Sequence, residues 1–286
     1  FAVFRRFPLP LEGAAVPNSS STEFYRSMVK ASYEKLKRKL PHWAQPYLLA
    51  HWLYYWVCGR RVFAGPFEGL RYVYTSVGSA YYNKLIATYE VELHDEVRRL
   101  IELKPKKIID VGTAEGYYAA GFARAVEGAE VVAFEGDPLG RSLQTKLLKR
   151  NHLENKVQIK GFCDTEALKS EISGADPTLV ILDCEGYENE LFDLEKVPAL
   201  AHCHLLIELH FFAHADILES LKERAAGSHD IAHLALRERT LDDFPSHPVL
   251  SKVPDRLKKY FMLEGRNEET EWLILTPKVP FSDVSV

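Results

Sequence analysis

The chain has few cysteines and no closely spaced cysteine pair. Four cysteines occur in 286 residues, at Cys58, Cys163, Cys184 and Cys203. None of them belongs to a C-x-x-C motif, the spacing typical of zinc-binding and thiol-redox sites. This wide spacing predicts a reduced, cytoplasmic protein.

An excess of positive charge is also missing. Lys and Arg number 36 against 40 for Asp and Glu, so the formal net charge is −4. This balance excludes a protein built mainly to hold the phosphates of a nucleic acid, and we expect no nucleic-acid partner. The hydrophobic fraction of 47% and the charged fraction of 27% are ordinary for a globular protein that buries a core.

No long hydrophobic run is present. The most apolar stretch, Tyr47–Cys58, has twelve residues and contains His51. A membrane-spanning helix needs about 20 apolar residues. The given sequence therefore predicts no transmembrane segment, and it contains no internal repeat or low-complexity segment.

The first part of the chain differs from the rest in composition. Residues 1–21 are predicted to form an irregular arm. Two helices should follow at 22–40 and 45–57, and the second is rich in aromatic residues. A hairpin is expected at 61–76 and an entry helix at 90–103. We expect residues 1–60 to be an extension that serves as a lid or as a surface for homo-oligomers. Contact with a membrane surface through Lys35, Lys37, Arg38 and Lys39 is the alternative. Residues 61–286 would form the main domain, with its core at 90–277.

From Lys107 onward short apolar runs alternate with helical segments. The expected strands are 107–111, 130–134, 157–160, 178–183 and 204–208, and the expected helices are 117–126, 139–151, 165–172, 188–195 and 215–226. Such alternation predicts an α/β fold of the Rossmann-like kind, with a mostly parallel sheet covered on both faces. Two final runs, Ile231–Leu236 and Trp272–Leu275, suit a last pair of strands that includes an antiparallel one.

The loop after the first strand, in IIDVGTAEGYY, lacks the middle glycine of a dinucleotide-binding loop. A G-x-G-x-x-G loop would need glycine at three positions, and this chain has Gly112, Ala114 and Tyr117 there. The pattern disfavours a pyrophosphate and therefore an NAD-dependent oxidoreductase. A loop with only Gly112 and Gly116 suits an amino-acid moiety, and a plain strand-to-helix turn remains the alternative.

Polar residues also follow the second and third strands. Glu135 lies 23 positions after Gly112, where a carboxylate can accept hydrogen bonds from both ribose hydroxyls. A solvated strand-end glutamate is the alternative. After the third strand, Phe162 can cover an adenine face, and Asp164 can accept from its exocyclic amine or cap the next helix.

Acidic residues gather after the fourth strand. Asp183, Glu185 and Glu188 fall within six residues. Their mutual repulsion calls for a metal, a cationic ligand or a substrate hydroxyl that loses its proton there.

The fifth strand ends in ELHFFAH and carries Glu208 and His210 to the same edge. His210 and His214 have the spacing of a zinc helix, but Phe211 stands where H-E-x-x-H requires glutamate. His210 is therefore the preferred candidate for a base or ligand group at the mouth of the sheet.

Four segments together resemble the FkbM-type methyltransferases, which have the class I fold and use S-adenosylmethionine. They are IIDVGTAEGYYAAGFA, VVAFEGDP, LVILDCEGYENELFD and LLIELH, within residues 67–277. The most distinctive is the D-x-E-G-x-E motif of Asp183, Glu185, Gly186 and Glu188. The resemblance predicts a class I methyltransferase sheet whose last strand is antiparallel.

The resemblance also implies a cofactor site. Residues 112–116 would wrap the methionine part of the cofactor, and Glu115 would contact its ammonium group. Glu135 would bind the ribose, and residues 162–164 would bind the adenine. The full set of expected cofactor contacts is Asp110, Gly112, Thr113, Ala114, Glu115, Gly116, Glu135, Phe162, Cys163, Asp164 and Asp183.

The expected reaction is O-methylation of a hydroxyl on a small molecule, natural product or glycan. Residues 1–75 and 237–270 would shape the acceptor pocket. We expect His210 to be the base, oriented by Glu208 or Glu185, with Asp183 beside the sulfonium. Mg²⁺ held by Asp183 and its neighbours is an alternative. A degenerate domain that binds cofactor or a partner without turnover also remains open.

Overall fold

The computed structural model describes residues 56–283, apart from residues 58, 78, 173, 175–176 and 265–269. The predicted arm, the helix at 22–40 and nearly all of the helix at 45–57 lie outside this part, as does the proposed oligomer surface. In the described part, no helix combines the length and apolar character needed to cross a membrane.

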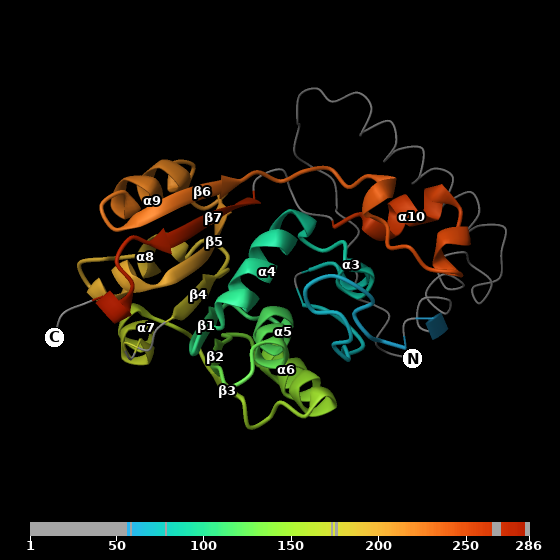
Figure 1. The fold of residues 1–286 in the computed structure, drawn as a ribbon, viewed down its shortest axis with the longest axis horizontal. Helices are drawn as coiled ribbons and strands as arrows, with labels where there is room; N and C mark the ends of the chain where they lie inside the picture. The colour runs from blue at the N-terminus through green and yellow to red at the C-terminus, as the bar shows by residue number, and fades with distance from the viewer. Residues whose placement is uncertain are drawn as a thin grey trace. The chain divides into compact units, whose positions relative to one another are not determined.

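A seven-stranded sheet forms the centre of the domain (Figure 1). Its order is β3-β2-β1-β4-β5-β7-β6. The strands are β1 (Lys107–Val111), β2 (Glu130–Phe134), β3 (Val157–Lys160), β4 (Thr178–Leu182), β5 (His204–His210), β6 (His229–Leu234) and β7 (Thr270–Pro277). The first five are parallel, whereas β7 runs antiparallel to both β5 and β6. This arrangement confirms the predicted fold class.

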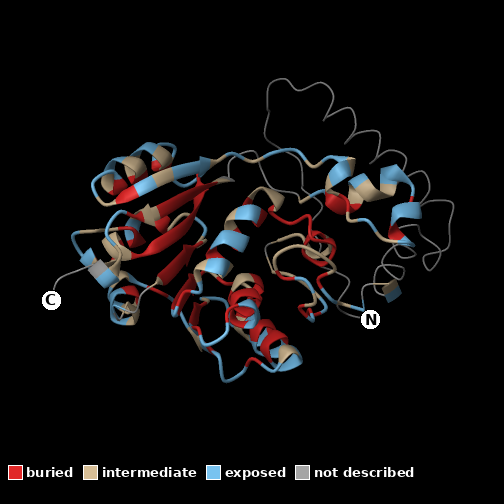
Figure 2. Cartoon of the chain, viewed as in Figure 1, coloured by how far each residue is buried: buried red, intermediate tan, exposed pale blue. Residues whose placement is uncertain are grey.

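The central strands are mostly apolar because helices cover both faces of the sheet. Every residue of β1, β4 and β5 is buried (Figure 2). Neighbouring residues point to opposite faces, so Ile108 belongs to one core cluster and Ile109 to the other. Helices α4, α5 and α6 pack on the first face, and α7, α8 and α9 on the second (Figure 1).

The helices of this part also follow the predicted alternation. They are α3 (Tyr81–Ile86), α4 (His94–Leu103), α5 (Tyr117–Ala125), α6 (Pro138–Asn151), α7 (Thr165–Glu171), α8 (Glu188–Leu191), α9 (Ile217–Ala225) and α10 (Asp255–Met262). The entry helix predicted from residue 90 begins as a 3-10 turn and becomes α-helical at His94. The helix predicted over 188–195 was too long. The Asp193 carboxylate accepts from the amides of Glu195 and Lys196, both at 3.0 Å, and the chain turns there.

The hairpin predicted at 61–76 forms only near its turn. An antiparallel bridge joins Arg61 to Arg71, and the amides of Val62 and Tyr72 donate across it to Leu70 O (2.9 Å) and Arg60 O (2.6 Å). No strand forms among the described residues of this segment, so the pairing is shorter than predicted. The amide of Phe63 donates to Leu85 O (2.7 Å), which ties the segment to α3.

The segment between β6 and β7 packs against the start of the domain through polar contacts. The Asn83 side chain donates to Met262 O at 2.8 Å. Arg239 donates to Thr88 O at 2.9 Å and forms ion pairs with Glu92 at 2.7 Å and Glu264 at 2.6 Å. These contacts place Glu264 at the rim of the cavity described below.

His94, at the start of α4, should make stability depend on pH. Burial is the main cause that lowers its pKa to about 4, and Nε2 lies 3.1 Å from Tyr89 O. The unfolded chain binds this proton near pH 6.5 and the folded chain only near pH 4, so stability falls as pH drops through this window. Between pH 7 and pH 4, the free energy of unfolding of the wild type should decrease by about 3 kcal/mol more than that of a His94→Gln variant. Urea titrations of both proteins measure this, and parallel pH curves would contradict it.

Candidate functional site

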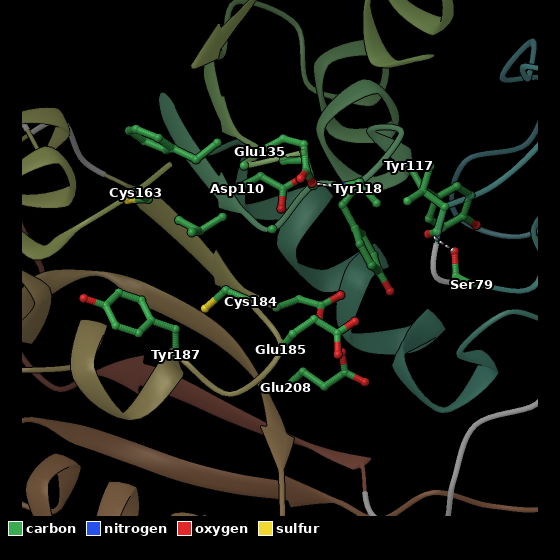
Figure 3. A pocket seen from close by; sticks show the side chains of 18 of the residues that line it. Ser79, Asp110, Tyr117, Tyr118, Glu135, Cys163, Cys184, Glu185, Tyr187 and Glu208 are labelled. Atoms are coloured by element: carbon green, nitrogen blue, oxygen red, sulfur yellow. Dashed lines mark hydrogen bonds between the residues drawn. The ribbon is translucent and has the colours of Figure 1, made fainter. Parts of the chain in front are cut away.

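A cavity of about 500 Å³ opens at the carboxyl ends of β1, β2, β4 and β5. This is the edge where ligands bind in open α/β sheets. Figure 3 shows Asp110 and Glu135 on one side of it and Glu185 and Glu208 on another. The residues that line it include Lys84, Asp110, Gly112, Thr113, Ala114, Tyr117, Tyr118, Glu135, Phe162, Cys163, Asp183, Cys184, Glu185, Tyr187, Glu208, His210, Phe212 and Glu264.

The turn after β1 requires a glycine at position 112. Gly112 has φ +86°, and a Cβ there would lie 1.6 Å from Asp183 O. The Gly112 amide donates to Phe134 O at 2.9 Å. Backbone from the ends of β1, β2 and β4 therefore meets at this point, and a side chain would push the loop out of place.

We expect Gly112→Ala to lower the free energy of unfolding by about 3 kcal/mol more than Gly128→Ala does, because the new methyl group collides with backbone. Gly128 is a matched control, since its φ is +79° and a methyl group at this position would have nothing within 4 Å. Both variants pay for the left-handed backbone, and only one adds the collision. Equal urea midpoints for the two variants would contradict this.

Glu135 is held in place at the end of β2. Its Oε2 accepts from the Ala114 amide at 2.6 Å, and its Oε1 accepts from the Asp137 amide at 2.7 Å. Burial raises its pKa, while the two amides act in the opposite direction. Each carboxylate oxygen has a second acceptor site, so the group can still accept two further hydrogen bonds in the cavity.

Asp110, on β1, is a buried carboxyl group at the base of the cavity. Burial, and then the nearby charge of Asp183, raise its pKa to about 8. Its Oδ2 is buried and has no hydrogen-bond partner in the described part of the chain. Buried polar atoms of this kind normally have a partner, so the cavity suits a ligand that can donate to Asp110.

Glu115 does not reach the cavity, contrary to the expected contact with an ammonium group. Its side chain is fully buried, and it forms an ion pair with Lys84 at 2.7 Å. It also accepts from the Val77 amide at 2.9 Å and from the Tyr72 hydroxyl. Burial opposes the charged form, but Lys84 and these donors lower its pKa overall. The sequence could not show that Lys84, 31 positions earlier, neutralises this group.

Two other expected cofactor contacts have structural roles in this geometry. A Cβ at Gly116 would lie 2.7 Å from the Gln144 side chain, so this glycine allows α5 to approach α6. Asp164 caps α7, because its carboxylate accepts from the Ala167 amide at 2.8 Å. Phe162 and Cys163 do line the cavity, and the Phe162 ring lies 5.6 Å from that of Tyr187.

His210, the last residue of β5, is oriented by Glu188. Its Nδ1 lies 2.9 Å from Glu188 Oε1, which also accepts from the amides of Cys184 (2.7 Å) and Gly186 (3.3 Å). The predicted orienting partners, Glu208 and Glu185, face the other ring nitrogen instead. Glu188 was not among the predicted catalytic residues, although its place in the D-x-E-G-x-E motif was a signal.

The Nε2 side of His210 faces three carboxylates. The distances from Nε2 are 3.6 Å to Glu208, 3.8 Å to Asp183 and 3.8 Å to Glu185. Burial opposes protonation of the imidazole, but Glu188, Asp183 and Glu185 raise its pKa overall. All four predicted catalytic residues therefore meet at one point.

His214 is not part of this group. It lies 3.8 Å from Glu190 and does not line the cavity. The histidine spacing in HFFAH therefore does not bring both imidazoles to one site, because β5 ends between them.

No family model and no curated protein matches the chain. Among solved structures, it is similar to the S-adenosylhomocysteine-bound methyltransferase PaMTH1 of Podospora anserina (17% identity, 92% of this chain and 98% of that one, TM-score 0.42). It is also similar to the O-methyltransferase TomG of Streptomyces achromogenes, in complex with SAM (13% identity, 65% and 78% covered, TM-score 0.43). A third is the O-methyltransferase of Bacillus cereus in complex with SAH (11% identity, 91% and 92% covered, TM-score 0.42). The activity has to be argued from the cavity itself.

Proposed function

We propose that this chain is an S-adenosylmethionine-dependent methyltransferase that acts on a hydroxyl group of a small molecule, natural product or glycan. One observation carries the proposal. A single cavity combines the Gly112 turn, the orphan carboxyl of Asp110 and the ribose-type acceptor Glu135 with the His210–Glu188 pair. The Gly112 turn, Asp110 and Glu135 suit a nucleoside with an amino-acid tail. The His210–Glu188 pair suits a second substrate.

The residues at the ends of β1 to β3 would hold the donor. The backbone after Gly112 would wrap the amino-acid part, with Asp110 as an acceptor for its ammonium group. Glu135 would accept from the ribose hydroxyls, and the rings of Phe162 and Tyr187 would lie against the adenine. When bound, S-adenosylmethionine supplies a methyl group that the positive sulfur already activates.

The chain's own contribution to the reaction would be orientation and exclusion of water. A hydroxyl must also lose its proton as its oxygen is methylated. We place the acceptor hydroxyl next to His210, whose ring Glu188 fixes and whose Nε2 faces the acidic group of Asp183, Glu185 and Glu208.

The geometry disfavours the oxidoreductase alternative. A dinucleotide-binding sheet has the order 3-2-1-4-5-6, whereas here the antiparallel β7 lies between β5 and β6. In addition, Ala114 stands at the loop position where a close pyrophosphate contact needs glycine.

We also propose the family, the extent of the catalytic domain and the location of the protein. The order of the four motifs at the strand ends supports an FkbM-type enzyme. Residues 61–286 would form its catalytic domain. Among the described residues, Cys163 and Cys184 are free thiols, which supports a cytoplasmic location.

Transfer of a labelled methyl group tests the activity. Wild type and a His210→Ala variant would be incubated with S-adenosylmethionine labelled in its methyl group and a set of sugars, phenols and alcohols. We expect labelled product from wild type and at least about 100-fold slower transfer by the variant. Binding of S-adenosylhomocysteine should be unchanged in the variant. Equal rates would remove His210 from the mechanism, and donor binding without transfer to any acceptor would favour a domain that binds without turnover.

A further inference from the structure

The ends of β4 and β5 bring one imidazole and four carboxylates together. His210 Nδ1 is hydrogen-bonded to Glu188, while Nε2 lies 3.6–3.8 Å from oxygens of Glu208, Asp183 and Glu185. These three distances lie within ion-pair range but exceed the length of a hydrogen bond. The carboxylates therefore converge on Nε2 without a hydrogen bond to it, and all three line the cavity together with His210.

A second observation concerns the fully buried side chain of Glu188. Its Oε1 has three donors, but its Oε2 is buried and has no hydrogen-bond partner among the described residues. A buried carboxylate oxygen without a donor raises the free energy of the fold, because it has lost its hydrogen bonds to water and no other hydrogen bond replaces them. A cation would satisfy it.

The spacing of the side chains fits one metal ion. Asp183, Glu188 and His210 each offer a ligand atom, and these three atoms lie within 4.8 Å of one another. Ligands on opposite sides of an ion bound at about 2.1 Å lie about 4.2 Å apart. Coordination by all three would replace the hydrogen bond between His210 Nδ1 and Glu188 with bonds to the ion, which needs only small side-chain adjustments.

The electrostatics of the proposed reaction also call for a cation. A hydroxyl that loses its proton develops negative charge, and several carboxylates nearby disfavour this charge. The lining lysine, Lys84, offers little compensation because Glu115 already neutralises it at 2.7 Å. A bound divalent ion reverses the balance, since it lowers the pKa of an oxygen that coordinates it.

We propose that Asp183, Glu188 and His210 bind one divalent transition-metal cation, such as Mn²⁺ or Zn²⁺, at the acceptor end of the cavity. An imidazole among carboxylates suits these ions, whereas Mg²⁺ prefers a set made only of oxygens. His210 then acts as a metal ligand, and Glu185 or Glu208 is the nearby group for the hydroxyl proton. The role in activating the acceptor rests on the proposed function, but the metal site itself does not.

Titration with Mn²⁺ tests the site directly. The electron paramagnetic resonance signal of free Mn²⁺ would be followed as untagged protein is added, with competition by Zn²⁺. We expect one Mn²⁺ per chain in wild type, and at least tenfold weaker binding in His210→Ala and Glu188→Gln. His214→Ala is the matched control, because His214 pairs with Glu190 outside the cavity and its loss should leave Mn²⁺ binding unchanged.

Circular dichroism would show that each variant is folded, and the same samples would be titrated with S-adenosylhomocysteine. Wild type that binds this ligand but no Mn²⁺ or Zn²⁺ overturns the metal site and leaves the proposed function intact. Equal Mn²⁺ affinity in wild type, His210→Ala and Glu188→Gln overturns the assignment of the ligands. Mn²⁺ binding that depends on His210, in a protein that does not bind S-adenosylhomocysteine, supports the site and counts against the proposed function.

Discussion

Replacing Glu135 with alanine is expected to weaken binding of S-adenosylhomocysteine about 100-fold. The carboxylate at the end of β2 retains two acceptor positions after bonding to the amides of Ala114 and Asp137. Two hydrogen bonds from ribose hydroxyls to a charged group account for an effect of about 3 kcal/mol. Isothermal titration calorimetry of wild type and variant measures the change.

Glu130→Ala is the matched control for that experiment. Glu130 lies at the opposite end of the same strand, its side chain is 66% exposed, and its partner is Lys107. Its loss should leave the affinity unchanged, because ligands bind only at the carboxyl edge of the sheet. If Glu135→Ala bound the ligand as tightly as Glu130→Ala, Glu135 would have no part in a donor site.

Replacing Arg239 with alanine is expected to lower the free energy of unfolding by about 3–5 kcal/mol. The Arg239 side chain is 7% exposed and pairs with Glu92 and Glu264, which are 5% and 6% exposed. Removal of the cation leaves two buried carboxylates without it, and this costs far more than the loss of a surface pair. Urea unfolding of wild type and variant gives the difference.

Arg237→Ala provides the comparison. Arg237 pairs with Asp243 at 2.6 Å, but its side chain is 46% exposed. Its loss should cost less than about 1 kcal/mol. Similar losses for the two arginines would mean that Arg239 does not hold the segment between β6 and β7 in place. Because Glu264 lines the cavity, we also expect Arg239→Ala to change the affinity for the methyl acceptor more than the affinity for S-adenosylhomocysteine.

The sequence predicted the parallel strands well because the central ones, β1 and β4, are buried on both faces. The bounds predicted for β1, β2 and β3 match those of the structure residue for residue. An apolar run of five residues between turn residues has few alternatives in an α/β pattern. The hairpin predicted at 61–76 pairs only near its turn, through one bridge between Arg61 and Arg71, and composition does not reveal how far such pairing extends.

The sequence predicted the residues that reach the edge of the sheet, but it did not predict the partner of each side chain. Asp110, Glu135, Asp183 and His210 all line the cavity, since the ends of parallel strands meet at one edge. Glu115 lies only three residues beyond Gly112 but points to Lys84. Glu188, rather than the predicted Glu208 or Glu185, pairs with His210, because its side chain is buried at the start of the short helix α8.

Titration of S-adenosylhomocysteine and of NAD into the wild-type protein tests the proposed activity most directly. Both ligands carry adenosine, but only NAD requires backbone close to a pyrophosphate, where this chain has Ala114. We predict one molecule of S-adenosylhomocysteine per chain and no binding of NAD. Binding of NAD in preference to S-adenosylhomocysteine, or of neither ligand, would contradict a methyl-donor site at Gly112.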